Sequence, residues 1–131
     1  MDLKPAFFAA GFSRLVTIPR MIDKPIYDAG PPLPIIEARD HILSAVATRT
    51  GIPPNEVLGN SRIYSVVYAR KLTSAALRAL GFTFACIGSA LNRDHASIIH
   101  QIEGIYALAC YEESAAHDLV WAIHAADELA S

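Results

Sequence analysis

Residues 84–104 read FACIGSALNRDHASIIHQIEG, a stretch in which two apolar segments flank a short polar one. The first apolar segment follows Thr83, a residue type that often caps the N-terminus of a helix. The second begins near Asp94, and its apolar residues recur at the spacing of one helical face. These apolar residues are Ile98, Ile102, Ile105 and Ala109. The sequence therefore predicts a short helix over 84–91, a tight turn at 92–93 and a longer helix over 94–110.

Three polar side chains, Arg93, Asp94 and His95, stand side by side where the longer helix should begin. Asp94 or Asn92 alone would supply the acceptor that caps the helix, so capping does not require Arg93 or His95. The free amides and partial positive charge of a helix N-terminus favour phosphate. Arg93 can grip a phosphate or chelate guanine, His95 can contact a base edge, and Asp94 can accept from a cytosine amino group. The alternative interpretation is an N-cap with two solvated neighbours.

A short helix, a tight turn and a longer helix have the proportions of a helix-turn-helix motif. In that motif the second helix enters the major groove of DNA. Many other all-α domains also contain two helices joined at a tight turn. The pattern of the remaining segments is therefore needed to distinguish a DNA-binding helix-turn-helix from an ordinary pair of helices.

Helical patterns continue on both sides of this motif, and no segment predicts a strand. Apolar spacing predicts a helix from about 35 to 50, which Gly51 should end. A short helix is expected within 52–59, a longer one over 63–80, and a final helix after a break near 112–114. The residues of the first helix expected to face inward are Ile36, Ile42, Leu43, Val46 and Ala47.

The chain is expected to divide into three parts. Residues 1–34 are rich in proline and should form an extended arm that lays aromatic side chains on the domain. Residues 35–112 should form an all-α helix-turn-helix bundle, and 113–131 an acidic helix packed on it. With this last helix, about five to six helices are expected. A hydrophobic content of 53% is enough to build a real core.

The charge is unevenly distributed along the chain, whose formal net charge is −2. Residues 51–100 carry an excess of three positive charges, whereas 101–131 hold six acidic residues and no Lys or Arg. This asymmetry indicates a single anion-facing surface, although solvated helix faces are often charged too.

Several classes of function lack their sequence signatures. No apolar run approaches the roughly 18 residues that span a bilayer, so we expect a cytoplasmic protein with no membrane partner. No GxxxxGK[ST] motif occurs, so no nucleotide is expected. The histidines and the two cysteines form no metal-type cluster, which predicts neither a metal nor another cofactor. No nucleophile and base stand at recognisable spacing, which argues against an enzyme.

The order of these segments resembles a known domain between Ile36 and Glu103. The matching elements are ILSAVATRTGI, PPNEVLGNSR, YARKLTSAALRAL and IGSALNRDHASIIHQI. They are similar to the C-terminal DNA-binding domain (domain IV) of the bacterial replication initiator DnaA, with a Trp-repressor-like helix-turn-helix fold. The residues that carry the family signature are Ile87, Gly88, Arg93, Asp94, His95, Ser97, Ile98, Ile99 and His100. The chain lacks the initiator's ATPase motif and is expected to be a free-standing copy of this domain.

The resemblance implies a sequence-specific reader of double-stranded DNA at an initiator-type box. It implies a role in transcription or in the initiation of replication. By this resemblance the residues at the major groove are Arg93, Asp94, His95 and Ser97. Arg62 matches an arginine that enters the adjacent minor groove, and Arg70 and Lys71 fall where the family has phosphate-contacting cations.

The chain also departs from the family pattern. Ala96 replaces a hydroxylic residue, while Gln101 and Gly104 replace a small and a basic residue of the recognition helix. Arg62 is alone in a loop where the family often has several cations. An alternative function is therefore a protein-interaction module that keeps the fold without specific DNA reading. Its partner, or a second copy of the chain, would dock on the N-terminal arm or the acidic C-terminal helix.

Overall fold

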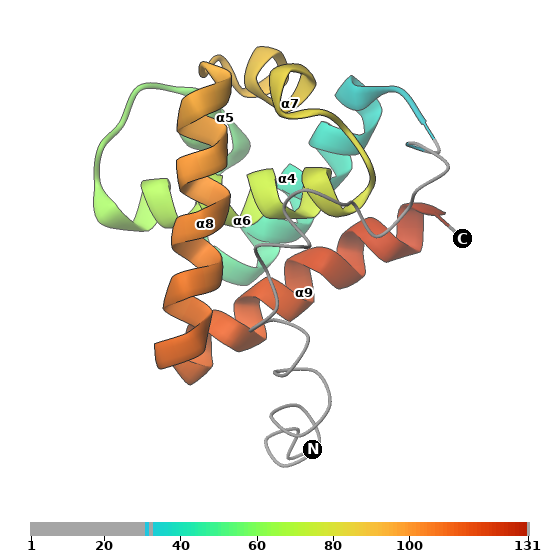
Figure 1. The fold of residues 1–131 in the computed structure, drawn as a ribbon. Coiled ribbons are helices and arrows are strands. Elements are labelled where there is room, and N and C mark those ends of the chain that lie inside the picture. Colours follow the sequence, from blue (N-terminus) through green and yellow to red (C-terminus); the bar gives the residue numbers. More distant parts are fainter. Residues whose placement is uncertain (1–30, 32, 131) are drawn as a thin grey trace.

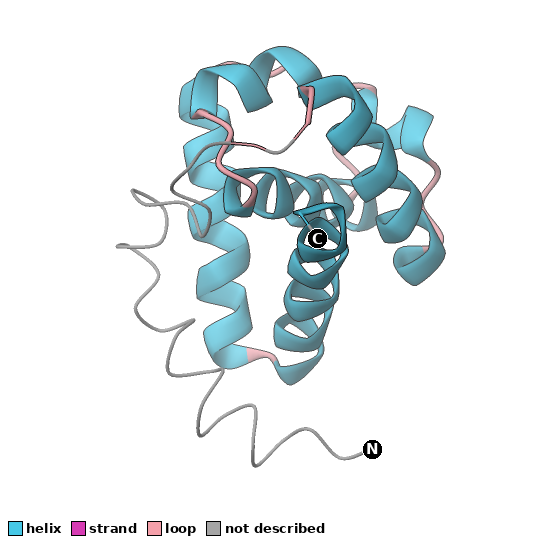
Figure 2. Ribbon diagram, turned by 90° about the vertical axis from the view of Figure 1, so that its right-hand side faces the viewer, coloured by secondary structure: helices cyan, strands magenta, loops and turns pink. Residues whose placement is uncertain are grey.

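The computed structural model describes residues 31 and 33–130, in which every regular element is a helix (Figures 1 and 2). The helices are α4 (Ile35–Thr50), α5 (Pro54–Leu58), α6 (Tyr64–Ala79), α7 (Phe84–Leu91), α8 (His95–Tyr111) and α9 (Glu113–Ala130). The prediction of an all-α fold is confirmed. The expected arm at 1–34 lies almost wholly outside the described residues.

Helix α6 lies at the centre of the bundle and contacts each of the other described helices. Most of its residues are buried, among them the small side chains of Ala69, Ala75 and Ala76. Small side chains let neighbouring helices approach closely. A residue on α6, where the predicted site residues Arg70 and Lys71 lie, is therefore held firmly relative to both α5 and α8.

The inward face of α4 differs in part from the prediction. Ile42, Leu43 and Val46 are buried as expected, but Ile36 is 47% exposed. Ala38 takes a place in the core instead. Because successive residues of a helix turn by about 100°, Ile36 lies on nearly the opposite side of α4 from Ala38. The small alanine lets the first turn of α4 pack closely against the bundle.

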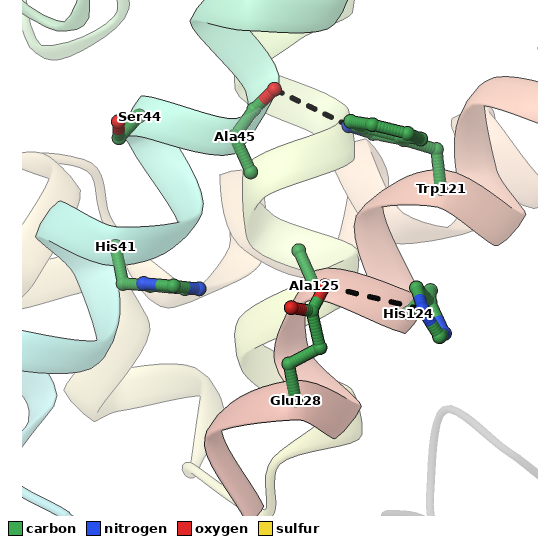
Figure 3. Close-up of a pocket in the computed structure, with 7 residues that line it drawn as sticks. All are labelled: His41, Ser44, Ala45, Trp121, His124, Ala125 and Glu128. Atoms are coloured by element: carbon green, nitrogen blue, oxygen red, sulfur yellow. Dashed lines mark hydrogen bonds and ion pairs between the residues drawn. The ribbon is translucent and has the colours of Figure 1, made fainter.

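Helix α9 is attached to the bundle by polar contacts as well as by its buried alanine and leucine side chains. The carboxylate of Asp118 accepts from Arg49 Nε at 2.8 Å and from the Tyr68 hydroxyl at 2.5 Å. Burial, and then this hydrogen bond, raise the pKa of Tyr68 above its usual value. Trp121 Nε1 donates to the Ala45 carbonyl at 3.2 Å, as Figure 3 shows. These contacts tie α9 to both α4 and α6.

A small pocket of about 220 Å³ lies between α4 and α9 (Figure 3). Its lining residues are His41, Ser44, Ala45, Trp121, His124, Ala125 and Glu128. The His124 imidazole lies 3.9 Å from the Glu128 carboxylate, and both side chains are largely exposed. No described helix is both long enough and apolar enough to cross a membrane.

Candidate nucleic-acid interface

The turn between α7 and α8 is closed by main-chain contacts that require specific residues. Asn92 adopts the left-handed conformation, with φ of 57° and ψ of 45°. The amide of Arg93 donates to the Gly88 carbonyl at 2.8 Å. A Cβ on Gly88 would lie 2.5 Å from the Arg93 carbonyl oxygen, so this close approach requires glycine. The predicted helix-turn-helix is confirmed, with α7 at the expected residues and α8 from His95 to Tyr111.

Side chains at the start of both helices cap them as the sequence predicts. The Thr83 hydroxyl accepts from the Cys86 amide at 3.1 Å at the start of α7. Asp94 Oδ1 accepts from the Ser97 amide at 2.8 Å at the start of α8. The Asp94 carboxylate also lies at the positive end of the α8 dipole, which stabilises it there. Capping therefore accounts for Asp94 without reference to any ligand.

The first turn of α8 faces solvent. Asp94, His95 and Ala96 are exposed, and Ser97 is half-buried. Beside them a shallow hollow of about 630 Å³ opens between α7 and the start of α8. The free amides of this first turn, its polar side chains and the hollow form one accessible surface. Three of the predicted DNA readers, Asp94, His95 and Ser97, thus lie together at the N-terminus of α8.

Arg93 lines the same hollow as Asp94 and His95, and it joins the helix-turn-helix to a distant loop. Its Nη1 donates to the Asn92 carbonyl at 2.9 Å, and its Nη2 donates to the Gly59 carbonyl at 2.6 Å. Gly59 follows α5, so this contact brings the loop from α5 to α6 beside the N-terminal end of α8 (Figure 1). The half-buried Arg93 side chain therefore connects the two regions that the family resemblance relates to the two DNA grooves.

Arg70, which the resemblance assigns to a phosphate contact, is buried in this structure. It is only 4% exposed, and its guanidinium donates to main-chain carbonyls of the α5 end and the following loop. These are the carbonyls of Val57 at 2.9 Å, Gly59 at 3.1 Å and Ser61 at 3.2 and 3.3 Å. Burial, and then the nearby Arg93, lower the pKa of Arg70 from its usual value. In this structure the guanidinium faces the loop and not the solvent.

The other two predicted cations, Arg62 and Lys71, are more accessible. Arg62 is exposed and helps to line a cavity of about 360 Å³. The other lining residues are Asn60, Ser61, Arg70 and Arg93. Lys71 is half-buried and lies along α8, where a Cβ added to Gly104 would be 3.3 Å from its Nζ. Lys71 thus places a cation beside α8 at a position where that helix has only a glycine.

Sequence reasoning missed two polar contacts that organise this region. The Gly59 carbonyl accepts from both Arg70 and Arg93, and no local pattern indicates that convergence. Gln101 accepts from the Ser74 hydroxyl at 2.8 Å and so joins α8 to α6. The burial of Arg70, by contrast, had a signal in the sequence, because Arg70 shares a helical face with inward-facing apolar residues.

No group of His, Cys, Asp and Glu side chains among the described residues could hold a metal ion. Comparison with curated proteins and with solved structures found no match to the chain. The family of the bacterial DnaA protein helix-turn-helix matches residues 39–105, from α4 into α8. This range is about half of the chain and includes every predicted site residue. The chain therefore belongs to the DnaA C-terminal helix-turn-helix family, which is a family of DNA-binding domains.

Proposed function

We propose that this protein binds double-stranded DNA sequence-specifically at a site like the initiator's box. Helix α8 would enter the major groove, and the loop carrying Arg62 would enter the adjacent minor groove. The protein would regulate transcription or the initiation of replication by binding, without catalysis. The observation that carries the proposal is the Arg93–Gly59 hydrogen bond, because it holds the loop next to the exposed first turn of α8.

The accessible groups at the start of α8 suit a base-reading role. His95 is exposed and can donate or accept at a base edge, and the Ser97 hydroxyl can do the same. The first-turn amides and the positive end of the helix dipole favour a neighbouring phosphate. Arg93 would contribute mainly by placing the loop, since its guanidinium already donates to two carbonyls.

A second candidate is a protein-interaction module with the same fold. Two large apolar side chains at the start of α6 favour it, because Ile63 is 67% exposed and Tyr64 is 69% exposed. Exposed apolar residues that adjoin one another often mark contact surfaces for a protein partner. Ala96 and the overall negative charge also favour this candidate. Ala96 lacks a hydroxyl that could contact DNA, and a net negative charge opposes binding to phosphates.

Titration of labelled duplexes tests the first proposal against the second. One duplex carries an initiator-type box and the other a scrambled sequence, each at two salt concentrations. Specific binding typically exceeds non-specific binding by ~10³ or more. His95→Ala should lower affinity for the box by roughly 5- to 150-fold and leave the scrambled duplex unaffected. Arg49→Gln, which removes a cation that pairs with Asp118 of α9, is the control and should keep the wild-type preference for the box.

Two outcomes would contradict sequence-specific reading. If the wild-type protein binds both duplexes equally and weakly, the interaction module becomes the better account of this fold. If His95→Ala keeps the full preference for the box, the first turn of α8 does not read bases.

A further inference from the structure

Two arginines from different helices converge on one main-chain oxygen. Arg70 Nη2, from α6, donates to the Gly59 carbonyl at 3.1 Å, and Arg93 Nη2, from the turn before α8, donates to the same oxygen at 2.6 Å. A carbonyl oxygen has two lone pairs and can accept both bonds. The loop between α5 and α6 is therefore held from two sides at one point, shortly before Arg62.

Arg70 contacts both the end of α5 and the loop that follows it. Its guanidinium donates to the carbonyls of Val57, Gly59 and Ser61, which are every second residue. Arg62 is the next residue after Ser61. These carbonyls include ones that the C-terminal end of α5 leaves without helical partners. A planar guanidinium with several fixed donors can satisfy such a set, whereas a lysine ammonium cannot reproduce the fork. The arrangement holds the loop in one conformation.

Simple packing does not explain a buried arginine at this position. Within the described residues the ion pairs found between side chains do not include Arg70, so its charge is compensated by carbonyl dipoles. A buried cation without a carboxylate partner is costly, and an apolar residue would usually suit an interior position better. The arginine does what an apolar residue could not do, because its hydrogen bonds hold the loop between α5 and α6 in place.

We propose that Arg70 is a positioning residue for DNA reading, which fixes the α5–α6 loop so that Arg62 stands at a set distance from the start of α8. The inference rests on the proposed function. In this role Arg70 acts through the loop and not by touching a phosphate. A loop ordered before binding loses less conformational freedom when Arg62 meets DNA, so the contact of Arg62 contributes more to affinity.

A double-mutant cycle tests the coupling between Arg70 and Arg62. In the wild-type background Arg62→Ala should weaken binding to the box duplex by roughly tenfold. In the Arg70→Lys background, which keeps the charge but loses the fork, the same change should cost about twofold or less, because the loop no longer holds Arg62 in place. If Arg62→Ala instead weakens binding by the same factor in both backgrounds, the two residues act independently and the proposal is wrong. Arg49→Gln serves as the background control, and in it Arg62→Ala should still cost about tenfold.

A loop insertion covers the case in which Arg70→Lys fails to fold. Two glycines inserted after Asn60, an exposed position, lengthen the loop and leave Arg70 intact. The insertion should also reduce the cost of Arg62→Ala to about twofold. If the cost stays near tenfold, Arg62 does not depend on the loop conformation, and the proposal is wrong.

Amide hydrogen exchange on the free protein tests the loop without any DNA. Arg70→Lys should speed exchange in 58–63 by about tenfold or more, with no change in α9. Unchanged exchange in 58–63 would show that Arg70 does not hold the loop, whatever the binding data. A wild-type protein that holds this loop but shows no preference for the box would instead refute the proposed function, and the reading role of Arg70 with it.

Discussion

The carbonyl oxygen of Arg93 lies so close to Gly88 that a Cβ at position 88 would approach it to 2.5 Å. The same turn carries the hydrogen bond from the Arg93 amide to the Gly88 carbonyl. The atoms nearest to such a Cβ belong to the main chain of Arg93 and Asp94, which cannot move aside as a flexible side chain could. Gly88 therefore sets the angle at which α8 leaves α7, and with it the direction of the exposed first turn.

Gly88→Ala should destabilise the fold by roughly 2 kcal/mol or more, because the turn must open to admit the methyl group. The matched control is Gly51→Ala. Gly51 also has a positive φ, of 79°, but has no neighbouring atom within 4 Å. It should cost only about 1 kcal/mol, from the left-handed conformation alone. Urea denaturation compares the two variants, and equal losses would contradict the steric argument.

Substitutions of Asp94 separate capping from base reading. Asp94→Ala removes the acceptor of the Ser97 amide and should cost about 1 kcal/mol in the free energy of unfolding. Asp94→Asn keeps a capping oxygen and should leave stability nearly unchanged. If the carboxylate also selects bases, Asp94→Asn alone should change the preferred duplex in a competition assay. An unchanged preference would restrict Asp94 to its capping role.

Lys71 provides a test of phosphate contact beside α8. Lys71→Gln should weaken binding to the box and to the scrambled duplex by the same factor, because phosphates carry no sequence information. The slope of log affinity against log salt should become shallower by about 0.9 for the one phosphate lost. Fluorescence titrations over a range of salt concentrations measure both effects. A loss confined to the box duplex would point to base reading instead.

Gly104→Ala tests how Lys71 lies along α8. The new Cβ would meet the Nζ of Lys71 at 3.3 Å, and this flexible end can move away. Alanine is favoured over glycine inside a helix by about 0.8–1.0 kcal/mol. We therefore expect a gain of up to this size in urea denaturation. A clear loss would mean that the Lys71 ammonium is held where it lies.

Alkaline pH should destabilise the protein through the buried Tyr106. Burial raises the pKa of Tyr106 from the usual 10.0 to about 12. Above pH 10 the unfolded chain releases this proton before the folded protein does, so stability falls as pH rises toward 12. The loss is up to about 1.4 kcal/mol per pH unit for one group. Tyr106→Phe should lose less stability over this pH interval, and urea midpoints at several pH values measure the difference.

Local signals were sufficient to predict the helices and the helix-turn-helix. Thr83 and Asp94 are capping residues, and both accept the expected amide hydrogen bonds. The apolar period of α8 corresponds to its buried face. These features depend on neighbours a few residues apart, so a pattern along the chain contains them. The presence of His95 at an exposed helix start follows from the same short stretch.

The sequence by itself determined the all-α fold, the position of the turn and the identity of the residues around it. Only the tertiary structure decided what the arginines do. Arg93 meets Gly59 across 34 residues, and Arg70 reaches loop carbonyls 9 to 13 residues away. Main-chain acceptors have no sequence signature, because every residue carries one. Which of them remain unpaired at the end of α5, and which side chain reaches them, depends on how α5, α6 and α8 pack together.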